Sequence, residues 1–480
     1  MSTSGAGRLF TLTEITSATS GRLVMAGSRS DVRSVVIDSR LSGPGALFIP
    51  LPGRRFDGHQ FISDAADRRS TGVLVSQAVW QQRSAALETM CARHGTGIVV
   101  VNDPLDALQR LACLHMRRAG QAVRIGITGS NGKTTTKEII ASVLSQSHVA
   151  HASAGNLNSE IGLPLSAFAV SPVHQYAVFE MAMNHAGEMD VLAEIVKPDI
   201  GLVTNVGVAH VGLLGSKQAI ANEKKKIFKY FDGRQTAFIR EREPFLQILA
   251  EGIRGRLVTY GPESTPGYSG SENLGLDGTV IHWEETQIRF PLIGYHNLQN
   301  ALAAISVGIQ LGLPTADIRR GLEAVEPAFA RAQVVRGPMT IIQDCYNANT
   351  DAVQQILSFV DDLQWPGRKI AVLGAMLELG DDALQEHAKV LDQVISCSFA
   401  EVFLVGEEYR SGYERAVQAR AHPRLTWAAG VEAVQKELAT VVREGDLVLL
   451  KGSRALEMER ILPQIMRREE RAMAGEIRGS

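Results

Sequence analysis

The chain has 480 residues, 45% of them hydrophobic, and a formal net charge of −2 at pH 7. That length predicts about three domains, and the near-neutral charge predicts no nucleic-acid partner. The four cysteines form no CxxC pair, and no apolar run approaches the roughly 18 residues of a membrane span, so we expect reduced thiols and a soluble cytoplasmic protein without membrane insertion.

Residues 1–120 alternate short apolar runs with stretches of helical spacing. Such alternation predicts a small N-terminal α/β domain. The runs expected to form strands are residues 35–37, 47–49, 72–75 and 98–101.

A glycine-rich turn at residues 126–135, Gly-Ile-Thr-Gly-Ser-Asn-Gly-Lys-Thr-Thr, is the most informative segment of the chain. It follows an apolar run at 122–127 and precedes apolar residues at helical spacing over 137–144. In a strand–turn–helix of this kind, backbone N–H groups and the helix N-terminus bind phosphate. Lys133 adds a cation, and the Thr134 hydroxyl is a magnesium ligand. The segment therefore predicts binding of ATP or GTP.

The spacing of this turn departs from the pattern GxxxxGK[ST], which would need glycine at Ile127. A strand–helix turn with chance glycines is the alternative interpretation. The Lys-Thr pair directly after the last glycine disfavours it.

Residues 121–327 are expected to form a central domain with a parallel, mononucleotide-binding sheet. The expected elements are strands at 176–183, 200–206 and 237–239, a loop at 261–278 with short β segments on either side, and a helix at 297–311.

Polar side chains follow two of these expected strands. Glu180 interrupts an apolar strand near its end, and beside a phosphate loop a magnesium ligand is favoured over a carboxylate that merely faces solvent. His210 lies just past the next strand, where the alternative is a structural histidine. Lys224, Lys225 and Lys226 cannot share one helix face, and a solvated cationic face is the simplest interpretation of each.

Residues 328–480 repeat the strand–helix pattern four times. This alternation predicts a C-terminal domain with a parallel, Rossmann-like sheet and helices on its faces. The expected strands are residues 340–344, 369–373, 401–405 and 446–450.

The order of several motifs resembles that of the Mur ligases, the ATP-dependent amide-forming enzymes of peptidoglycan precursor synthesis. The motifs that carry the family resemblance are residues 128–134, 155–158 and 295–300, with Glu180 and His210. Within the family, the branch that adds a D-alanyl-D-alanine dipeptide is indicated by residues 154–162, 184–188, 344–349, 376–380 and 451–454, together with 38–40 and 55–59 near the N-terminus.

The resemblance implies roles for individual residues. Those implied in catalysis are Lys133, Glu180, His210, Lys224 and Arg331. Those implied in ATP binding are Thr128, Gly129, Ser130, Asn131, Gly132, Lys133, Thr134 and Thr135, with Asn297 at the adenine, Asp344 at the ribose and Arg331 at the phosphates. The implied metal ligands are Thr134, Glu180, His210 and a carbamylated Lys224, and the implied substrate-binding residues are Ser39 and Arg40 near the uridine diphosphate, Asn156, Asn158, Asn347 and Asn349.

The resemblance also implies the reaction and its partners. ATP with two magnesium ions would phosphorylate the terminal carboxylate of UDP-N-acetylmuramoyl-tripeptide, and the amine of D-alanyl-D-alanine would displace phosphate. We expect a monomer. Two alternatives are another amide ligase of the superfamily and a P-loop switch protein that hydrolyses nucleotide without an acceptor.

Three segments depart from the family pattern, and one of them is Ala455, Leu456 and Glu457 after the motif at 451–454, where a basic residue is more usual. Thr350 and Ala352 replace Pro and Ser after the Tyr-Asn-Ala-Asn motif, and Ala375 stands where an acidic or polar residue is common. All three lie in the expected C-terminal domain. They bear on the choice of amine substrate and leave the ATP chemistry untouched.

Overall fold

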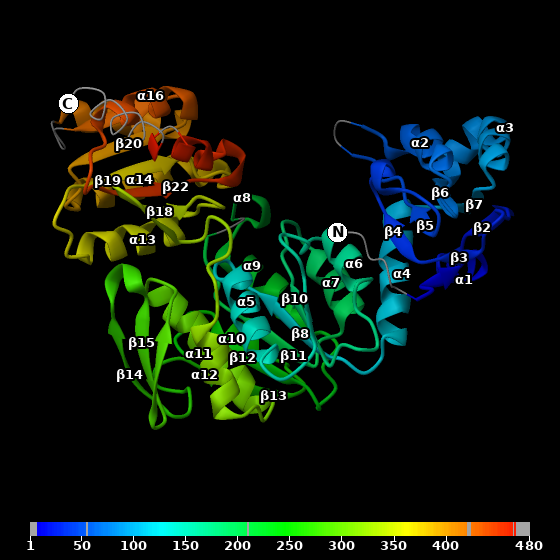
Figure 1. Cartoon of the computed structure of the whole chain (residues 1–480), viewed down its shortest axis with the longest axis horizontal. Coiled ribbons are helices and arrows are strands. Elements are labelled where there is room, and N and C mark those ends of the chain that lie inside the picture. Colours follow the sequence, from blue (N-terminus) through cyan, green and yellow to red (C-terminus); the bar gives the residue numbers. More distant parts are fainter. Residues whose placement is uncertain (1–6, 54–55, 209–210, 420–423, 464, 467–480) are drawn as a thin grey trace, which may run out of the picture.

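The three largest of the five sheets in the described part of the chain, built on the apolar runs of successive segments, organise the molecule (Figure 1). The computed structural model describes residues 7–53, 56–208, 211–419, 424–463 and 465–466. His210 and residue 55 of the N-terminal motif lie outside the described residues. The prediction of an α/β chain with three units is confirmed, whereas the boundaries at 120/121 and 327/328 stay predictions.

The N-terminal unit contains a five-stranded sheet in the order β2-β7-β6-β5-β4, in which β2 alone runs antiparallel to its neighbour. All four expected strands are present. The strands of this unit are β1 (Phe10–Thr11), β2 (Arg22–Met25), β3 (Asp31–Val32), β4 (Ser34–Val36), β5 (Ala46–Phe48), β6 (Gly72–Ser76) and β7 (Gly97–Val101). Its helices are α1 (Leu12–Ala18), η1 (Ser39–Leu41), η2 (Gly58–Phe61), α2 (Ile62–Asp67), α3 (Gln77–His94) and α4 (Pro104–Arg118).

Helix α4 joins this unit to the central one. The Asp103 carboxylate accepts a hydrogen bond from Leu105 N, and Pro104 occupies the first helical position, so both the cap and the fixed proline φ start the helix here. The helix packs on α1 on one side and on α6 and α7 of the central unit on the other.

The central sheet has six parallel strands in the order β13-β12-β11-β8-β10-β9. Its strands are β8 (Val123–Thr128), β9 (Ala150–Ala152), β10 (Tyr176–Glu180), β11 (Ile200–Val203), β12 (Thr236–Arg240) and β13 (Arg256–Tyr260). The helices around it are α5 (Lys133–Leu144), α6 (Gly162–Ala167), α7 (Glu188–Val196), α8 (Val211–Leu214), α9 (Lys217–Lys225), η3 (Lys226–Phe228), α10 (Leu246–Ala250), α11 (Tyr295–Gln310) and α12 (Thr315–Glu323).

Strand β8 lies at the middle of this sheet, between β11 and β10. In register, Glu180 pairs with Ile127 and Val203 pairs with Thr128, so the carboxyl ends of β10, β8 and β11 meet at one edge. The connection from β8 leads to one side of the sheet, and the chain later returns to the other side at β11. Ligands of open parallel sheets bind at such a switch point.

The predicted loop at 261–278 is wrong in part, because β14 (Tyr268–Asn273) lies within it. This strand forms an antiparallel sheet with β15 (Thr279–Trp283) and β16 (Thr286–Phe290), and η4 (Gly275–Asp277) makes the turn. Its sequence, YSGSEN, is an edge strand that is mostly exposed, so it lacks the apolar alternation by which strands are recognised.

The C-terminal sheet has the order β17-β18-β22-β19-β20-β21, parallel except for β17. The four expected strands form its centre, and the two edge strands were not predicted. Its strands are β17 (Gln333–Arg336), β18 (Thr340–Asp344), β19 (Lys369–Gly374), β20 (Glu401–Val405), β21 (Leu425–Ala428) and β22 (Leu447–Lys451). Its helices are α13 (Thr350–Asp362), η5 (Gly380–Asp382), α14 (Ala383–Ser396), η6 (Glu407–Tyr409), α15 (Arg410–Gln418), α16 (Val431–Val441), η7 (Arg454–Leu456) and η8 (Met458–Ile461).

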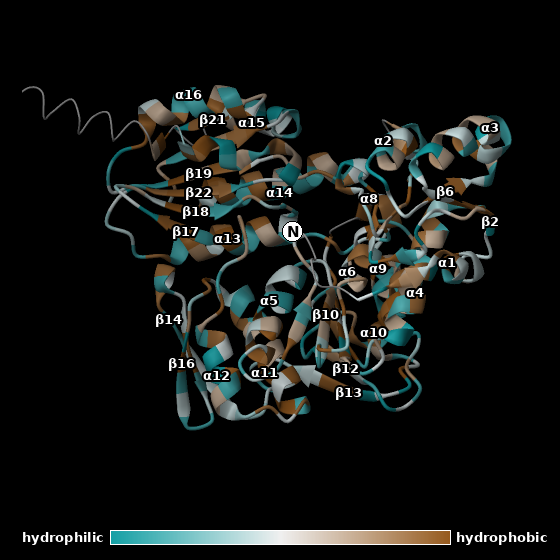
Figure 2. Ribbon diagram, turned by 45° about the vertical axis from the view of Figure 1, so that its right-hand side comes forward, coloured by the Kyte–Doolittle hydropathy of each residue, from teal (hydrophilic) through white to brown (hydrophobic). Residues whose placement is uncertain are grey.

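The hydropathy pattern follows this layering. In Figure 2 the strands β18, β19 and β22 are brown between helices with teal outer faces. Residues on these strands such as Ile342, Val372 and Leu449 are fully buried. Within the part of the chain that the structure describes, no helix is both long and apolar enough to cross a membrane.

Candidate active site

The glycine-rich turn connects β8 to α5 as a phosphate loop. Gly129 and Gly132 have φ values of 152° and 81°, a region that favours glycine. A Cβ at Gly129 would lie 1.8 Å from Thr204 Oγ1, and one at Gly132 would lie 2.7 Å from Asn300 Oδ1. The two glycines therefore allow both the turn and its close packing, and the N–H groups at the start of α5 remain available for an anion.

The Lys133 side chain folds back onto this turn. Its Nζ donates to the carbonyl oxygens of Gly129 and Ser130, at 2.8 and 3.2 Å. Burial lowers the pKa of Lys133, Glu180 opposes that shift, and Arg331 adds to it. A bound polyphosphate would favour the charged ammonium in this setting.

Glu180 and Thr134 meet where β10 ends beside the first turn of α5. Thr134 Oγ1 donates to Glu180 Oε2 at 2.6 Å, and Asn158 Nδ2 donates to Glu180 Oε1 at 2.7 Å. Glu180 is 2% exposed, and its own N–H donates to Ser153 Oγ at 3.1 Å. The carboxylate is thus buried and held in one orientation, which fits a metal ligand better than a solvated strand end.

The donor atoms of this pair fit magnesium, because a hydroxyl and a carboxylate offer the hard oxygens that the ion prefers. Among the described residues, no group of three or more His, Cys, Asp or Glu side chains gathers as a metal site. His210, the third expected ligand, lies outside the described residues.

Lys224 faces the interior, unlike its two neighbours. It is 2% exposed, whereas Lys225 and Lys226 form ion pairs with Glu251 and Asp190 at 3.0 and 2.7 Å. Burial, followed by repulsion from Lys133, holds the pKa of Lys224 well below its usual value. The solvated interpretation holds for Lys225 and Lys226, and Lys224 is a buried amine close to the phosphate loop.

Two acidic side chains that the sequence did not single out hold the loop between β10 and α7. Glu223 Oε1 accepts from Gly187 N at 2.8 Å and from Met189 N at 3.1 Å, while Glu188 accepts from the backbone of Asn184 and His185. Helix α9 therefore fixes this loop with the residue next to Lys224.

The residues expected at the adenosine lie on two units. Asn297, near the start of α11, donates to Ile293 O at 2.9 Å and accepts from Asn300 at 3.1 Å. Asp344, at the end of β18, pairs with Lys451 at 2.9 Å and accepts from Ala332 N at 3.1 Å. Both side chains are held in place by neighbours within their own unit.

Arg331 lies on the connection between the central and C-terminal sheets. Its guanidinium is 4.2 Å from the ring centroid of Tyr346, a cation–π contact. Both residues line a cavity of about 600 Å³ that also contacts Thr134, Gly155 and Phe329. Arg331 can therefore reach the region of the phosphate loop from the C-terminal side.

The remaining predicted residues are spread over the three units. Ser39 and Arg40 form η1 in the N-terminal unit, where Arg40 pairs with Asp38 at 2.6 Å. Asn156 lies in the loop after β9, and its carbonyl oxygen accepts from Asn158 N at 2.8 Å. Asn347, whose carbonyl oxygen accepts from Lys451 Nζ at 2.8 Å, belongs to the C-terminal unit. The structure brings Lys133, Thr134, Glu180 and Asn158 together and leaves Ser39 and Arg40 on another unit.

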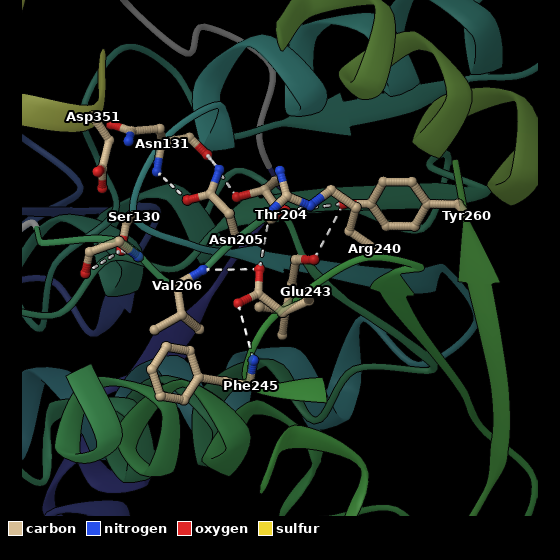
Figure 3. Close-up of polar contacts among 12 residues, drawn as sticks. Ser130, Asn131, Thr204, Asn205, Val206, Arg240, Glu243, Phe245, Tyr260 and Asp351 are labelled. Atoms are coloured by element: carbon tan, nitrogen blue, oxygen red, sulfur yellow. Dashed lines mark hydrogen bonds and ion pairs between the residues drawn. The ribbon is translucent and has the colours of Figure 1, made fainter. Parts of the chain in front are cut away.

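Further polar residues that the sequence pattern does not predict lie behind the phosphate loop. They are Lys137, Ser153, Thr204, Asn205, Glu243 and Asp351, several of which Figure 3 shows. Thr204 and Asn205 carried a usable signal, because they directly follow β11 at the ligand-binding edge of the sheet. Glu243 and Asp351 carried none, because they reach the site only through tertiary contacts.

A phosphate loop backed by a buried carboxylate, at the centre of three α/β units, defines a nucleotide-dependent P-loop enzyme. Three family models match successive parts of the chain: "Mur ligase family, catalytic domain" at residues 31–115, "Mur ligase middle domain" at 127–308, and "Mur ligase, glutamate ligase domain" at 330–454. The chain belongs to the Mur ligase family.

Several of the similar proteins are of MurF type. A UDP-N-acetylmuramoyl-tripeptide–D-alanyl-D-alanine ligase of Treponema pallidum is 37% identical over 96% of this chain and 100% of its own length. Crystal structures of MurF from Acinetobacter baumannii (TM-score 0.85, 26% identity, 95% of this chain and 99% of that chain) and of MurF from Thermotoga maritima in complex with ADP (TM-score 0.76, 26% identity, 92% and 99%) share the fold. The family resemblance inferred from the motifs is confirmed.

Proposed function

We propose that this chain joins D-alanyl-D-alanine to the terminal carboxylate of UDP-N-acetylmuramoyl-tripeptide, with cleavage of ATP to ADP and phosphate. The observation that carries the proposal is the full-length similarity to the Treponema pallidum ligase. The phosphate loop, with Glu180 behind it, supplies the nucleotide chemistry that such a ligase needs.

The reaction has two steps. A carboxylate oxygen of the tripeptide attacks the γ-phosphorus of ATP, and the bond between this phosphorus and the β-phosphate oxygen breaks. ADP departs, and the tripeptide carboxylate has become an acyl phosphate. The dipeptide amine then attacks the acyl carbon, gives up a proton, and expels phosphate to form the amide. The first step brings two anions together, so positive charge at the γ-phosphate lowers its barrier.

We assign that charge to Lys133 and Arg331, which approach the phosphates from the central and C-terminal units. Thr134 and Glu180 would hold one magnesium ion, with His210 as a further ligand. A carbamylated Lys224 would bind a second magnesium ion. Magnesium neutralises phosphate charge and orients the γ-phosphoryl group when bound. Burial lowers the pKa of the Lys224 amine and so favours the neutral form, which is the form that reacts with carbon dioxide.

The other ligands would lie around this centre. We assign the phosphate-loop backbone and Thr135 to the ATP phosphates, Asn297 to the adenine and Asp344 to the ribose. Ser39 and Arg40 would bind the uridine diphosphate. The residues proposed near the peptide substrates are Asn156, Asn158, Asn347 and Asn349.

Thr350 and Ala352, which depart from the family pattern, lie in the first turn of α13, and Ala375 directly follows β19. Thr350 is buried at the first position of α13, and its hydroxyl lies 3.9 Å from Met376 Sδ. Ala352 N is capped by Asn349 at 3.0 Å, and Ala375 is 1% exposed. The start of α13 is thus formed without proline. We also propose that the protein is a monomer and that it acts in the cytoplasm, where precursors of the cell wall are built.

The experiment that tests it is phosphate release from ATP with magnesium, with the mass of the product, while each substrate is omitted in turn. Release that needs both the UDP-tripeptide and D-alanyl-D-alanine, and a product of the pentapeptide mass, supports the proposal. Joining of a different amine would change the substrate assignment, and hydrolysis with neither substrate would indicate a switch protein.

A further inference from the structure

The N-terminus of α13, from the C-terminal unit, lies directly on the phosphate loop of the central unit. Asn349 Nδ2 donates to Asn131 Oδ1 at 2.7 Å, and Asn131 Nδ2 donates to Asn349 Oδ1 at 3.3 Å. The two side-chain amides thus form a reciprocal pair across the unit boundary. The same Asn349 oxygen also caps α13 through Ala352 N.

Asn131 is in turn held by the segment that follows β11, residues 204–208, which we call the β11 loop. Asn205 Oδ1 accepts from Asn131 N at 2.9 Å, and Asn205 Nδ2 donates to Asn131 O at 3.2 Å. The Thr204 hydroxyl donates to the same Asn131 oxygen at 2.6 Å. Figure 3 shows Thr204 and Asn205 beside Asn131. The backbone orientation of the phosphate loop therefore depends on the β11 loop.

The β11 loop is itself clamped at three consecutive N–H groups. Val206 N donates to Glu243 Oε2 at 3.3 Å, Gly207 N to Ser130 Oγ at 2.8 Å, and Val208 N to Asp351 Oδ2 at 3.1 Å. The first two acceptors belong to the central unit, whereas Asp351 comes from α13.

The approach of Asp351 is close enough to constrain the sequence of the β11 loop. A Cβ at Gly207 would lie 2.3 Å from Asp351 Oδ2 and 3.4 Å from Ser130 Cβ. With glycine at position 207 the Asp351 carboxylate fits beside the phosphate loop, whereas a side chain there would displace it.

We propose that Asn349 and Asp351 are positioning residues for the nucleotide. They place the N-terminus of α13 against Asn131 and the β11 loop, and so fix the phosphate-loop backbone in the arrangement that receives the phosphates. The proposal deepens the proposed ATP-dependent function and rests on it. Because coupling between sites is reciprocal, nucleotide binding also strengthens the docking of the C-terminal unit on the central one.

This role differs from the dipeptide contact that the resemblance implies for Asn349. Its side-chain oxygen accepts from Ala352 N and Asn131, and its amide nitrogen donates to Asn131. The oxygen and the nitrogen of the Asn349 side-chain amide are therefore both hydrogen-bonded, and their partners belong to the phosphate loop or to α13. The two roles predict changes in different Michaelis constants.

The test uses variants that separate the interdomain contact from the stability of α13. Asn349→Ser keeps a helix-capping oxygen but is too short to pair with Asn131. Asp351→Ala removes the acceptor for Val208 N, and Asp351→Asn keeps an acceptor oxygen. Asp362→Ala, at the exposed far end of α13, is the matched control.

We expect Asn349→Ser and Asp351→Ala each to raise the KM for ATP by about tenfold, because each variant loses one or two hydrogen bonds. The KM for D-alanyl-D-alanine should stay unchanged. Asp351→Asn should stay within about threefold of the parent protein. A rise in the dipeptide KM with an unchanged ATP KM would overturn the proposal. Equal losses in all kinetic constants together with a lower Tm would overturn it as well, in favour of a structural role.

Two measurements do not depend on amide formation. Calorimetry of Mg-ADP binding should show the same tenfold weakening in Asn349→Ser and Asp351→Ala, and unchanged ADP affinity would overturn the proposal even if the ligase assay succeeds. Hydrogen exchange over residues 204–208 should accelerate in Asp351→Ala and not in Asp362→Ala. If no amide product forms with any substrate, the proposed function fails, while ADP binding still decides the role of Asn349 and Asp351.

Discussion

Lys224 is a buried amine, and its burial together with the nearby charge of Lys133 favours the uncharged, nucleophilic form. Burial and repulsion from Lys133 hold the pKa of Lys224 well below its ordinary value. A neutral amine is a nucleophile toward carbon dioxide, and the resulting carbamate would carry a negative charge beside Lys133. The proposed modification would thus replace an unfavourable interaction between two amines with a favourable ion pair.

Lys224→Ala should lower kcat by at least about 100-fold, because the carbamate oxygens would no longer hold a metal ion. Short carboxylic acids should restore part of the activity by supplying the missing carboxylate. Lys225→Ala, which removes an ion pair at the surface, is the matched control and should keep normal activity. Near-normal turnover of Lys224→Ala would contradict the carbamate assignment.

His151, on β9, gives the protein a measurable pH dependence of stability. Burial, followed by His174 and Lys137, lowers its pKa from 6.5 to about 4. The unfolded chain therefore binds a proton that the folded chain does not, and this contribution to stability is complete above pH 6.5 and lost as the pH falls toward 4. The slope is about 1.4 kcal/mol per pH unit at most.

His151→Gln should flatten that part of the profile when the free energy of unfolding is measured by urea titration between pH 7.5 and pH 4.5. His148→Gln, three positions earlier in the chain, is the control and should leave the slope as it is. An identical slope in the parent protein and in His151→Gln would show that other groups govern this pH range.

The packing of α12 on α5 positions the helix that carries the phosphate loop. An added Cβ at Gly321 would lie 2.3 Å from Val143 Cα, and the Ser142 hydroxyl donates to Gly321 O at 2.7 Å. The two helices therefore touch backbone to backbone. Glycine within a helix usually costs stability, so its presence here is explained by this close approach.

Gly321→Ala should destabilise the protein by about 1–3 kcal/mol, because α12 must move away from α5, although alanine has the better helix propensity. Thermal unfolding checks this. Gly337→Ala is the control, since its nearest neighbour, Met339 O, would be 3.6 Å away. A raised Tm for Gly321→Ala would mean that the two helices separate without cost.

At the scale of the whole molecule, the proposed substrate sites lie on three units. Ser39 and Arg40 belong to the N-terminal unit, the phosphate loop to the central unit, and Asn347 to the C-terminal unit (Figure 1). The reacting carboxylate, γ-phosphate and amine can meet only if these units come together. The C-terminal unit already contacts the phosphate loop through Asn349.

Small-angle scattering should therefore show a smaller radius of gyration when an ATP analogue and UDP-tripeptide are both present. Each ligand alone is the control and should give a smaller change. An unchanged radius with both ligands bound would contradict closure by movement of whole units.

Most of the interior strands could be predicted, since a strand buried on both faces is a continuous apolar run wherever the chain places it. The edge strands β14, β17 and β21 could not be predicted from the sequence. Each is partly exposed and is held mainly by backbone hydrogen bonds, so its sequence shows no continuous apolar run. The strands β10 and β11 also end earlier than their apolar runs, at Glu180 and Val203, where the backbone turns toward the site.

The sequence by itself determined the phosphate loop, the carboxylate at the end of β10 and the family, because each depends on neighbours within about ten residues or on the order of motifs. It also determined that Lys224, Lys225 and Lys226, at the end of α9 and the start of η3, could not share a face, but not which of them is buried. Only the tertiary structure decided that Lys224 is the buried lysine and that Asp351 and Glu243 clamp the β11 loop. Such contacts join positions more than thirty residues apart in the chain, and packing rather than local propensity creates them.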